Sequence, residues 1–143
     1  MANKNSVFVD SNYFIALFNV SDSLHDQAGE LAESMLKQDV SLCISNYIVL
    51  EVLTVLSQRV SRSAAKVAAD SLSDGKQIEV MHISEELHNL SLQVFQTTEA
   101  KNISLVDCSI LALLNYAGIK RLLTFDVTDF KPLRERFDFS FFQ

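Results

Sequence analysis

Hydrophobic residues along this chain follow two spacings, one typical of strands and one typical of helices. Short runs rich in β-branched and aromatic residues predict strands at 6–9, 40–44, 77–83, 121–125 and 137–142. Between these runs, apolar residues recur every three or four positions and predict helices at 13–18, 24–37, 46–58, 63–72, 85–100 and 103–116. Strands that alternate with helices predict an α/β fold, in which a mostly parallel sheet is covered by helices on both faces.

Length and composition limit the class of protein. The chain has 143 residues, of which 48% are apolar, enough to bury the core of one domain without disulfides. We therefore expect a single domain over residues 1–143. No apolar stretch approaches the ~18 residues of a membrane-spanning helix, and no signal peptide is evident. Cys43 and Cys108 lie within apolar segments, which favours buried thiols in a reducing cytoplasm.

Acidic residues outnumber basic ones, and four of them stand at unusual places. The net charge of −6 disfavours a protein that binds nucleic acid simply by being basic, but not one whose acids hold metal ions. Asp10 and Asp126 each follow a predicted strand, and ligands of parallel sheets bind beyond the carboxyl ends of strands. Glu51 lies on the apolar face of a predicted helix, where an unpaired charge is unfavourable, and Asp107 opens another apolar helix.

Three of these acids have a structural interpretation as helix caps. Asp10 is placed to cap the helix that follows it. Ser104 and Asp107 fit a capping box, in which the third helical residue bonds back to the capping residue. Asp126 and Asp129 fit an N-cap followed by a first-turn acid that the helix dipole favours. Capping and chemistry are therefore competing interpretations at each position.

Glu51 also has a structural interpretation, an ion pair with a buried arginine, although its segment offers no arginine nearer than Arg59. If the four acids instead lie together in one pocket, this has a direct chemical consequence. Two unit charges at ~4 Å repel by about 4 kcal/mol at an effective dielectric of 20, so clustered acids either take up protons or bind cations. Oxygen ligands without histidine or cysteine favour Mg²⁺ or Mn²⁺. These ions bind phosphate oxygens and activate water, which indicates phosphodiester hydrolysis.

The segments that carry these acids resemble a known family in their order, spacing and flanking residues. They are VFVDSN at 7–12, the helix around Glu51, SLVDC at 104–108 and LLTFD at 122–126. Together they resemble the PIN-domain nucleases, and the length is similar to that of VapC-type toxins of type II toxin–antitoxin pairs. The resemblance implies a three-layer α/β/α sandwich and a Mg²⁺- or Mn²⁺-dependent endoribonuclease that acts on RNA. It also implies a homodimer and a small antitoxin protein as partner.

The resemblance assigns roles to individual residues. The family's acidic quartet, which holds the metal, matches Asp10, Glu51, Asp107 and Asp126. In this assignment Glu51 is either a metal ligand or the group that orients a bound water. Polar positions that orient the acids and the water match Ser11 or Asn12, and Thr124. Asp129 lies near the position of an occasional extra acid, although the family often has that acid one residue closer to the strand.

Two other functions and one basic cluster remain open. A phosphatase would use Asp10 as the nucleophile that forms an aspartyl phosphate, but such enzymes commonly carry a second aspartate where this chain has Asn12. A non-catalytic interaction module could share the fold. If the helix continues past residue 61, one of its faces would carry residues able to grip RNA phosphates, namely Arg59, Arg62 and Lys66. A solvated surface is the competing interpretation of that cluster.

Overall fold

A parallel sheet forms the centre of the protein, and the computed structural model describes residues 3–143. In this part of the chain the strands lie in the order β3-β2-β1-β4-β5, and each neighbouring pair is parallel. Their bounds are Ser6–Val9 for β1, Ser41–Ser45 for β2, Ile78–Met81 for β3, Arg121–Leu123 for β4 and Ser140–Phe141 for β5. The central strand β1 is buried along its whole length, as its uninterrupted apolar run predicts.

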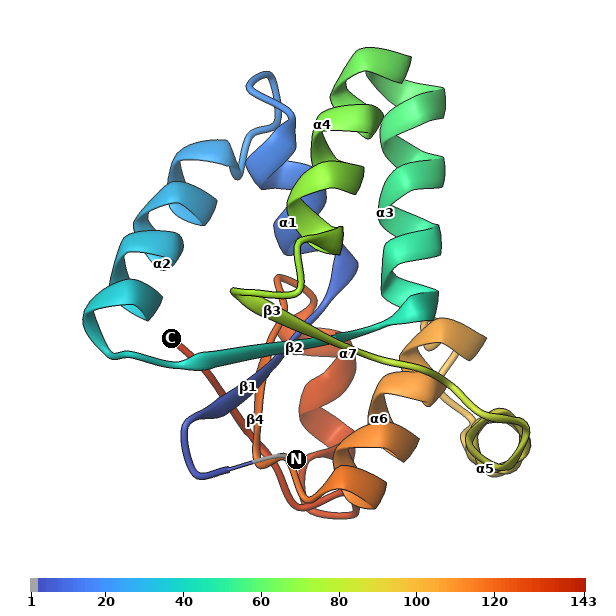
Figure 1. Cartoon of the computed structure of the whole chain (residues 1–143). Coiled ribbons are helices and arrows are strands. Elements are labelled where there is room, and N and C mark those ends of the chain that lie inside the picture. Colours follow the sequence, from blue (N-terminus) through green and yellow to red (C-terminus); the bar gives the residue numbers. More distant parts are fainter. Residues whose placement is uncertain (1–2) are drawn as a thin grey trace.

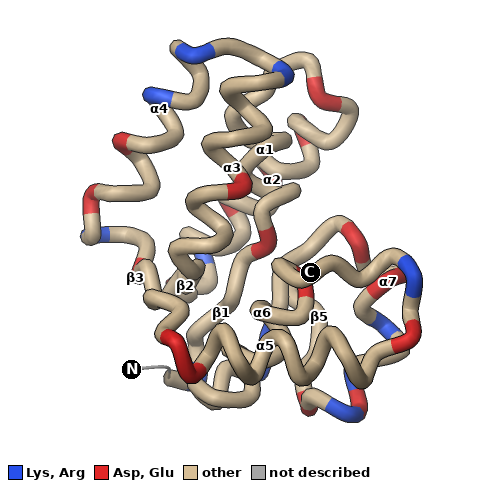
Figure 2. The backbone as a smooth tube through the Cα atoms, turned by 90° about the vertical axis from the view of Figure 1, so that its right-hand side faces the viewer, with Lys and Arg blue, Asp and Glu red and all other residues tan. Residues whose placement is uncertain are grey.

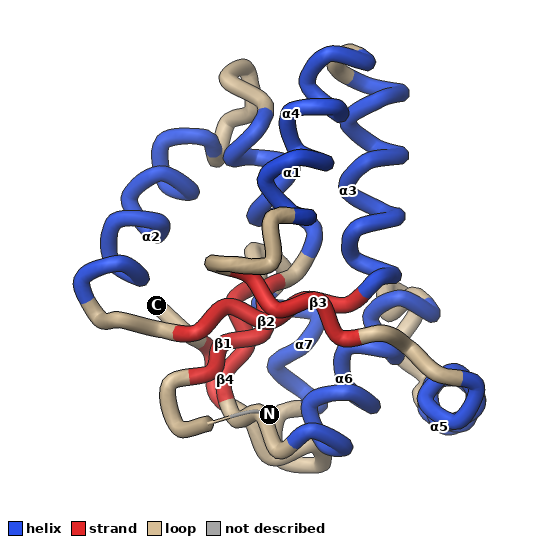
Figure 3. The backbone as a smooth tube through the Cα atoms, viewed as in Figure 1, coloured by secondary structure: helices blue, strands red, loops and turns tan. Residues whose placement is uncertain are grey.

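Helices cover both faces of this sheet, as Figure 1 shows. One face carries α1 (Ser11–Phe18), α2 (His25–Lys37), α3 (Asn46–Arg59) and α4 (Arg62–Ser73). The other carries α5 (Glu85–Thr97), α6 (Leu105–Ala117) and α7 (Val127–Phe130), which is followed by the 3₁₀ turn η1 (Lys131–Leu133). Figure 3 shows the strands running between the two groups of helices. The predicted three-layer α/β/α sandwich is therefore confirmed.

Helix α6 lies in the core because it is apolar on all sides. Every residue from position 108 to position 114 is buried. The helix begins after Ser104, which caps it, and ends at Gly118, whose φ of 69° is in the left-handed region that glycine adopts readily. Cys43 and Cys108 are free and buried, as predicted, and burial raises the pKa of the Cys108 thiol to about 11. Neither cysteine is therefore an activated nucleophile.

The predicted strand at 137–142 is wrong over most of its length. Only Ser140–Phe141 pairs with β4. The backbone N–H groups of Phe137 and Phe139 donate to the carbonyls of Leu133 and Arg134, at 3.1 and 3.3 Å, so this segment turns before it reaches the sheet. Helix α7 does begin after Asp126 and has Asp129 in its first turn, as the capping interpretation requires, but the Asp126 side chain makes no capping hydrogen bond. No helix within residues 3–143 has the length and apolar character needed to cross a membrane.

Candidate active site

Asp10 lies directly after the central strand β1 and is only 2% exposed. Its Oδ1 accepts a hydrogen bond from the backbone N–H of Ser11 at 2.7 Å, and its Oδ2 accepts one from the hydroxyl of Thr124 at 2.8 Å. The first bond caps α1, so the capping interpretation of Asp10 is correct. Burial raises the pKa of Asp10 from its ordinary value of 3.8 to about 7, and the charges of Asp107 and Glu51 also raise it. A carboxyl group that is hard to ionise thus stands at the end of the central strand.

The parallel pairing of β1 with β4 brings Thr124 to Asp10. The backbone N–H of Asp10 donates to the carbonyl of the last residue of β4 at 2.9 Å. The Thr124 hydroxyl accepts from the backbone N–H of Asp126 at 3.0 Å and from the side-chain amide of Asn12 at 3.4 Å. The amide oxygen of Asn12 in turn accepts from the backbone N–H of Phe125 at 3.2 Å. Asn12 and Thr124 therefore fix the ends of the two strands to each other.

Glu51 reaches the same place from the second turn of α3. The hydroxyl of Ser11 donates a hydrogen bond to Glu51 Oε1 and also lies 3.4 Å from Asp10 Oδ1. Ser11 therefore connects the two acids, because its backbone N–H already donates to Asp10. Glu51 is half-buried, and its partner is this hydroxyl, not the buried arginine of the alternative interpretation.

Asp107 is the third residue of α6 and forms the predicted capping box with Ser104. Its Oδ2 accepts from the backbone N–H of Ser104 at 3.0 Å, and its own N–H donates to the Ser104 hydroxyl at 3.1 Å. Burial raises the pKa of Asp107, and the charges of Glu51 and Asp126 also raise it. Asp107 therefore caps its helix and at the same time interacts electrostatically with two of the other acids.

The four acids share one electrostatic environment although they come from four segments of the chain. Asp10 is affected by the charges of Asp107 and Glu51, and Asp107 by those of Glu51 and Asp126. Asp10 is buried, Glu51 and Asp107 are half-buried, and Asp126 is exposed. Charge effects among such groups require short distances, because charge interactions weaken with separation and screening. Figure 2 shows acidic positions on α3 and at the junction of β1 with α1, on the side of the molecule where α6 and α7 lie. The acids thus surround the carboxyl ends of β1 and β4.

The chemistry of these donors fits a divalent cation, although the side chains are not arranged as a ready set of ligands. Within residues 3–143, no three carboxylate, histidine or cysteine groups are placed closely enough to hold a metal ion. The carboxylates of Asp10, Glu51 and Asp107 are instead bonded to nearby serine or threonine groups. All the acids offer oxygen, which hard cations prefer. A bound cation would offset the repulsion between the acids, which adds to burial in raising the pKa of Asp10 and Asp107.

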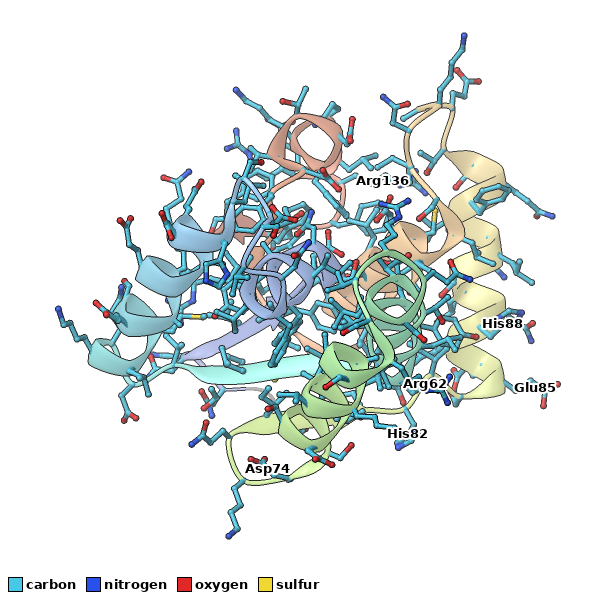
Figure 4. The ribbon with its side chains drawn as sticks, turned by 90° about the horizontal axis from the view of Figure 1, so that it is seen from above. Arg62, Asp74, His82, Glu85, His88 and Arg136 are labelled. Carbon is cyan, nitrogen blue, oxygen red and sulfur yellow. The ribbon has the colours of Figure 1, made fainter. Side chains whose placement is uncertain are left out.

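Asp129 and the histidines lie outside this hydrogen-bond network. Oδ1 of Asp129, on α7, accepts from the side-chain amide of Asn102 at 3.4 Å. The Nδ1 atom of His88, on α5, lies 2.7 Å from the hydroxyl of Tyr47, and that of His25, on α2, lies 2.8 Å from the carbonyl of Ala16. Figure 4 shows His82 and His88 apart from each other, at different places on the molecule. The histidines therefore form no metal-binding group with one another.

The condition for a continuous basic face is not met, because the helix breaks between Arg59 and Arg62. α3 ends at Arg59, and the hydroxyl of Ser61 caps a new helix, α4, that starts at Arg62. Arg59, Arg62 and Lys66 are all exposed. Arg59 lies roughly 12 Å along α3 from Glu51, given a rise of about 1.5 Å per residue. Figure 2 shows basic positions at the end of the α3–α4 hairpin that lies away from the sheet.

A groove with a volume of about 1120 Å³ lies between α2 and α4, beside β2 and β3. Its apolar lining includes Phe14 and Leu17 of α1, Met35 and Leu36 of α2, and Leu72 of α4. Leu36 is 78% exposed, so this wall of the groove is open to solvent. The sequence pattern shows only that each helix has an apolar face, so it did not predict a groove whose walls come from three helices.

The fold and the site together define a class of protein, the hydrolases that cluster carboxylates at the carboxyl ends of parallel strands. Comparison with known families makes this specific, because the model of the PIN domain matches residues 7–134. The chain belongs to the PIN-domain family, whose members are nucleases that act on phosphodiester bonds and generally require divalent metal ions. The resemblance to PIN-domain nucleases is thereby confirmed.

Known relatives share most of the chain. The sequence is 29% identical over 120 residues to the 23S rRNA-specific endonuclease VapC20 of Mycobacterium tuberculosis, which covers 84% of this chain and 88% of that protein. The crystal structure of that VapC20, described as a sarcin–ricin loop cleaving toxin, has a TM-score of 0.77 at 23% identity and covers 88% of this chain and 94% of its own. The structure of VapBC2 from Rickettsia felis bound to a promoter DNA fragment has a TM-score of 0.70 at 15% identity. The match covers 96% of this chain and 97% of that one. FitAcB from Neisseria gonorrhoeae has a TM-score of 0.66 at 15% identity, with 96% of both chains covered.

Proposed function

We propose that this protein is a metal-dependent endoribonuclease and the toxin of a toxin–antitoxin pair. The observation that carries the proposal is that four acids around the ends of β1 and β4 affect one another's charge in a chain of the PIN family, namely Asp10, Glu51, Asp107 and Asp126. RNA as the substrate is supported by the relative VapC20, which is named as an endonuclease specific for 23S rRNA. The toxin role is supported by the structural likeness to VapC20, which is described as a toxin, and to a toxin–antitoxin complex from Klebsiella pneumoniae.

The residues of the site would have different roles in binding the metal ion and orienting the water. Asp10, Asp107 and Asp126 would hold Mg²⁺ or Mn²⁺, and Glu51 would bind the ion or orient a water molecule. When bound, the ion supplies positive charge that lowers the pKa of a water and offsets charge on the phosphate. Hydrolysis forms a bond between the water oxygen and phosphorus, breaks the bond to the 3′ oxygen, and leaves that oxygen protonated. Thr124 would orient Asp10, to which it donates a hydrogen bond.

Cleavage of RNA tests this function directly. The purified protein should cut a 23S rRNA fragment in the presence of Mg²⁺ or Mn²⁺ and should stop when a chelator is added. The Asp10→Asn variant should fold but lose cleavage, because the amide replaces a negatively charged ligand. Cleavage by Asp10→Asn at the wild-type rate would contradict the assignment. Phosphate trapped on Asp10 would instead favour an aspartyl-phosphate phosphatase, and absence of Mn²⁺ binding at millimolar concentration would favour an interaction module.

An antitoxin would occupy the apolar groove between α2 and α4. The groove is large and apolar, and its lining includes Tyr13 and Phe14 of α1, the helix that begins beside Asp10. Leu36→Asp should abolish co-purification with the antitoxin encoded beside the gene while cleavage of RNA persists. Retention of the complex by this variant would exclude the groove as the docking site.

The expected homodimer remains a prediction for the isolated protein. Sedimentation equilibrium gives the mass directly, and a mass of one chain at micromolar concentration would exclude a stable dimer. The exposed basic residues Arg59, Arg62 and Lys66 remain candidates for contacts with RNA phosphates, now at the tip of a hairpin.

A further inference from the structure

The carboxylate of Asp107 is fixed to the start of its own helix by a closed pair of hydrogen bonds. Its Oδ2 accepts from the backbone N–H of Ser104 at 3.0 Å, while the Ser104 hydroxyl accepts from the backbone N–H of Asp107 at 3.1 Å. The hydroxyl bond holds the capping residue at the helix start, and this in turn holds the N–H that anchors the carboxylate. The orientation of Asp107 therefore depends on Ser104.

The anchoring bond uses only one of the two carboxylate oxygens. The Ser104 hydroxyl also interacts with this carboxylate and lowers its pKa, but no hydrogen-bond distance within residues 3–143 involves Oδ1 of Asp107. An ionised carboxylate accepts at both oxygens, so one oxygen remains available for another ligand while the other is held in place. The charges of Glu51 and Asp126 both act on Asp107, so this carboxylate is near the other acids of the site.

Other helices of the protein have the same kind of cap without a carboxylate attached to it. The hydroxyl of Ser84 accepts from the N–H of Leu87 at 3.2 Å at the start of α5, and that of Ser61 accepts from Ala64 at 3.0 Å at the start of α4. The third helical residue is apolar in both cases. Among the helices of residues 3–143, only α6 has a third residue whose carboxylate accepts a hydrogen bond from the backbone N–H of the capping residue.

We infer that Ser104 is a positioning residue for metal binding, which it supports by fixing Asp107; the inference rests on the proposed function. Groups that orient metal ligands from behind typically change metal affinity by about 10-fold to 100-fold when they are removed. Without the hydroxyl, residue 104 still has its backbone N–H, but this N–H is no longer held in place at the start of the helix. The capping and metal-binding interpretations of Asp107 are then compatible, because they use different oxygens of one carboxylate.

Ser84 provides a closely matched control for Ser104. Both residues are exposed N-caps of helices of 13 residues, and their backbone angles are similar, at φ −73° and ψ 172° for Ser84 and φ −82° and ψ 173° for Ser104. Ser84→Ala therefore removes a comparable cap from a helix whose third residue is not an acid. Ser104→Thr keeps a hydroxyl that caps helices and should restore the function of the serine.

Calorimetric titration of the full chain with Mn²⁺, together with its melting temperature, tests the inference. We expect the Mn²⁺ dissociation constant to rise about 10-fold in Ser104→Ala and to stay within about threefold of wild type in Ser104→Thr and Ser84→Ala. The two alanine variants should lose similar amounts of Tm. Wild-type Mn²⁺ affinity in Ser104→Ala, with the same loss of Tm, would overturn the inference alone. Absence of Mn²⁺ binding by the wild type would overturn the proposed function and the inference with it.

Discussion

Replacing Asp10 with asparagine should stabilise the metal-free protein above neutral pH, even though it should abolish cleavage. The folded carboxyl group has a pKa of about 7, against an ordinary value of 3.8, because it is buried. Between these two values the folded chain keeps a proton that the unfolded chain has lost, so stability falls as the pH rises through this window and levels off above it. The full difference corresponds to about 4 kcal/mol, as an upper limit, at 1.36 kcal/mol for each pKa unit.

Asparagine removes this dependence on pH but alters the hydrogen bonds of the site. Its amide oxygen can accept from the N–H of Ser11, whereas its NH₂ group faces the Thr124 hydroxyl that donated to the carboxylate. A poorer bond at that position costs about 1 kcal/mol. We therefore expect Asp10→Asn to be about 1–3 kcal/mol more stable than wild type at pH 8.

Urea unfolding in EDTA at pH 5 and pH 8 measures this effect. Between these two pH values the wild type should lose about 3 kcal/mol that Asp10→Asn keeps. Asp70→Asn, at an exposed position on α4, is the control and should follow the wild type at both pH values. If Asp10→Asn is less stable than the wild type by the same amount at pH 5 and pH 8, then folding does not raise the pKa of Asp10 and the reasoning is refuted.

Two further predictions concern orientation of the acids and contact with RNA. Thr124→Val removes the hydroxyl that donates to Asp10, so kcat for RNA cleavage should fall at least about 10-fold. Thr128→Val, at an exposed position, serves as the control. An unchanged kcat in Thr124→Val would exclude an orienting role for Thr124. Arg62→Glu combined with Lys66→Glu should weaken RNA binding and reduce its salt dependence, because each lost phosphate contact lowers the slope of log K against log salt by about 1. Filter binding at several salt concentrations measures this slope, and the wild-type slope in the variant would show that the hairpin tip does not contact the RNA.

The centre of the sheet could be predicted from the sequence, and its edge could not. The central strands β1 and β4 contain short buried apolar runs, Val7–Val9 and Leu122–Leu123, and this pattern depends only on burial from both sides. The bounds of β5 depend instead on where the backbone of residues 137 and 139 finds its hydrogen-bond partners. The same holds for the break between α3 and α4, where Ser61 caps a new helix. Such choices are made by tertiary contacts that the local sequence does not record.

The candidate site was partly predictable because its acids occupy positions that topology brings together. Asp10 and Asp126 follow strands that proved to be neighbours, and Glu51 is the one acid of α3, with apolar residues on both sides of it in the sequence. The bridge that Ser11 forms between Asp10 and Glu51 could not be predicted, because it depends on the rotamers of three side chains. Sequence reasoning also set capping against chemistry, whereas the caps at Asp10 and Asp107 leave the acids in one another's electrostatic field.

The hydrogen bonds of the site compensate its charges only in part. The groups that lower the pKa of Asp10 are the hydroxyl of Thr124 and the N–H of Ser11, and those that lower the pKa of Asp107 belong to Ser104. All of these donors are neutral, so they stabilise each carboxylate separately but cannot cancel the repulsion between carboxylates. Asp10 therefore keeps a raised pKa of about 7, mainly because it is buried and in part because these donors leave the charges of Asp107 and Glu51 uncompensated. A cation is the simplest group able to remove this remainder, so the folded state and the metal-bound state should stabilise each other.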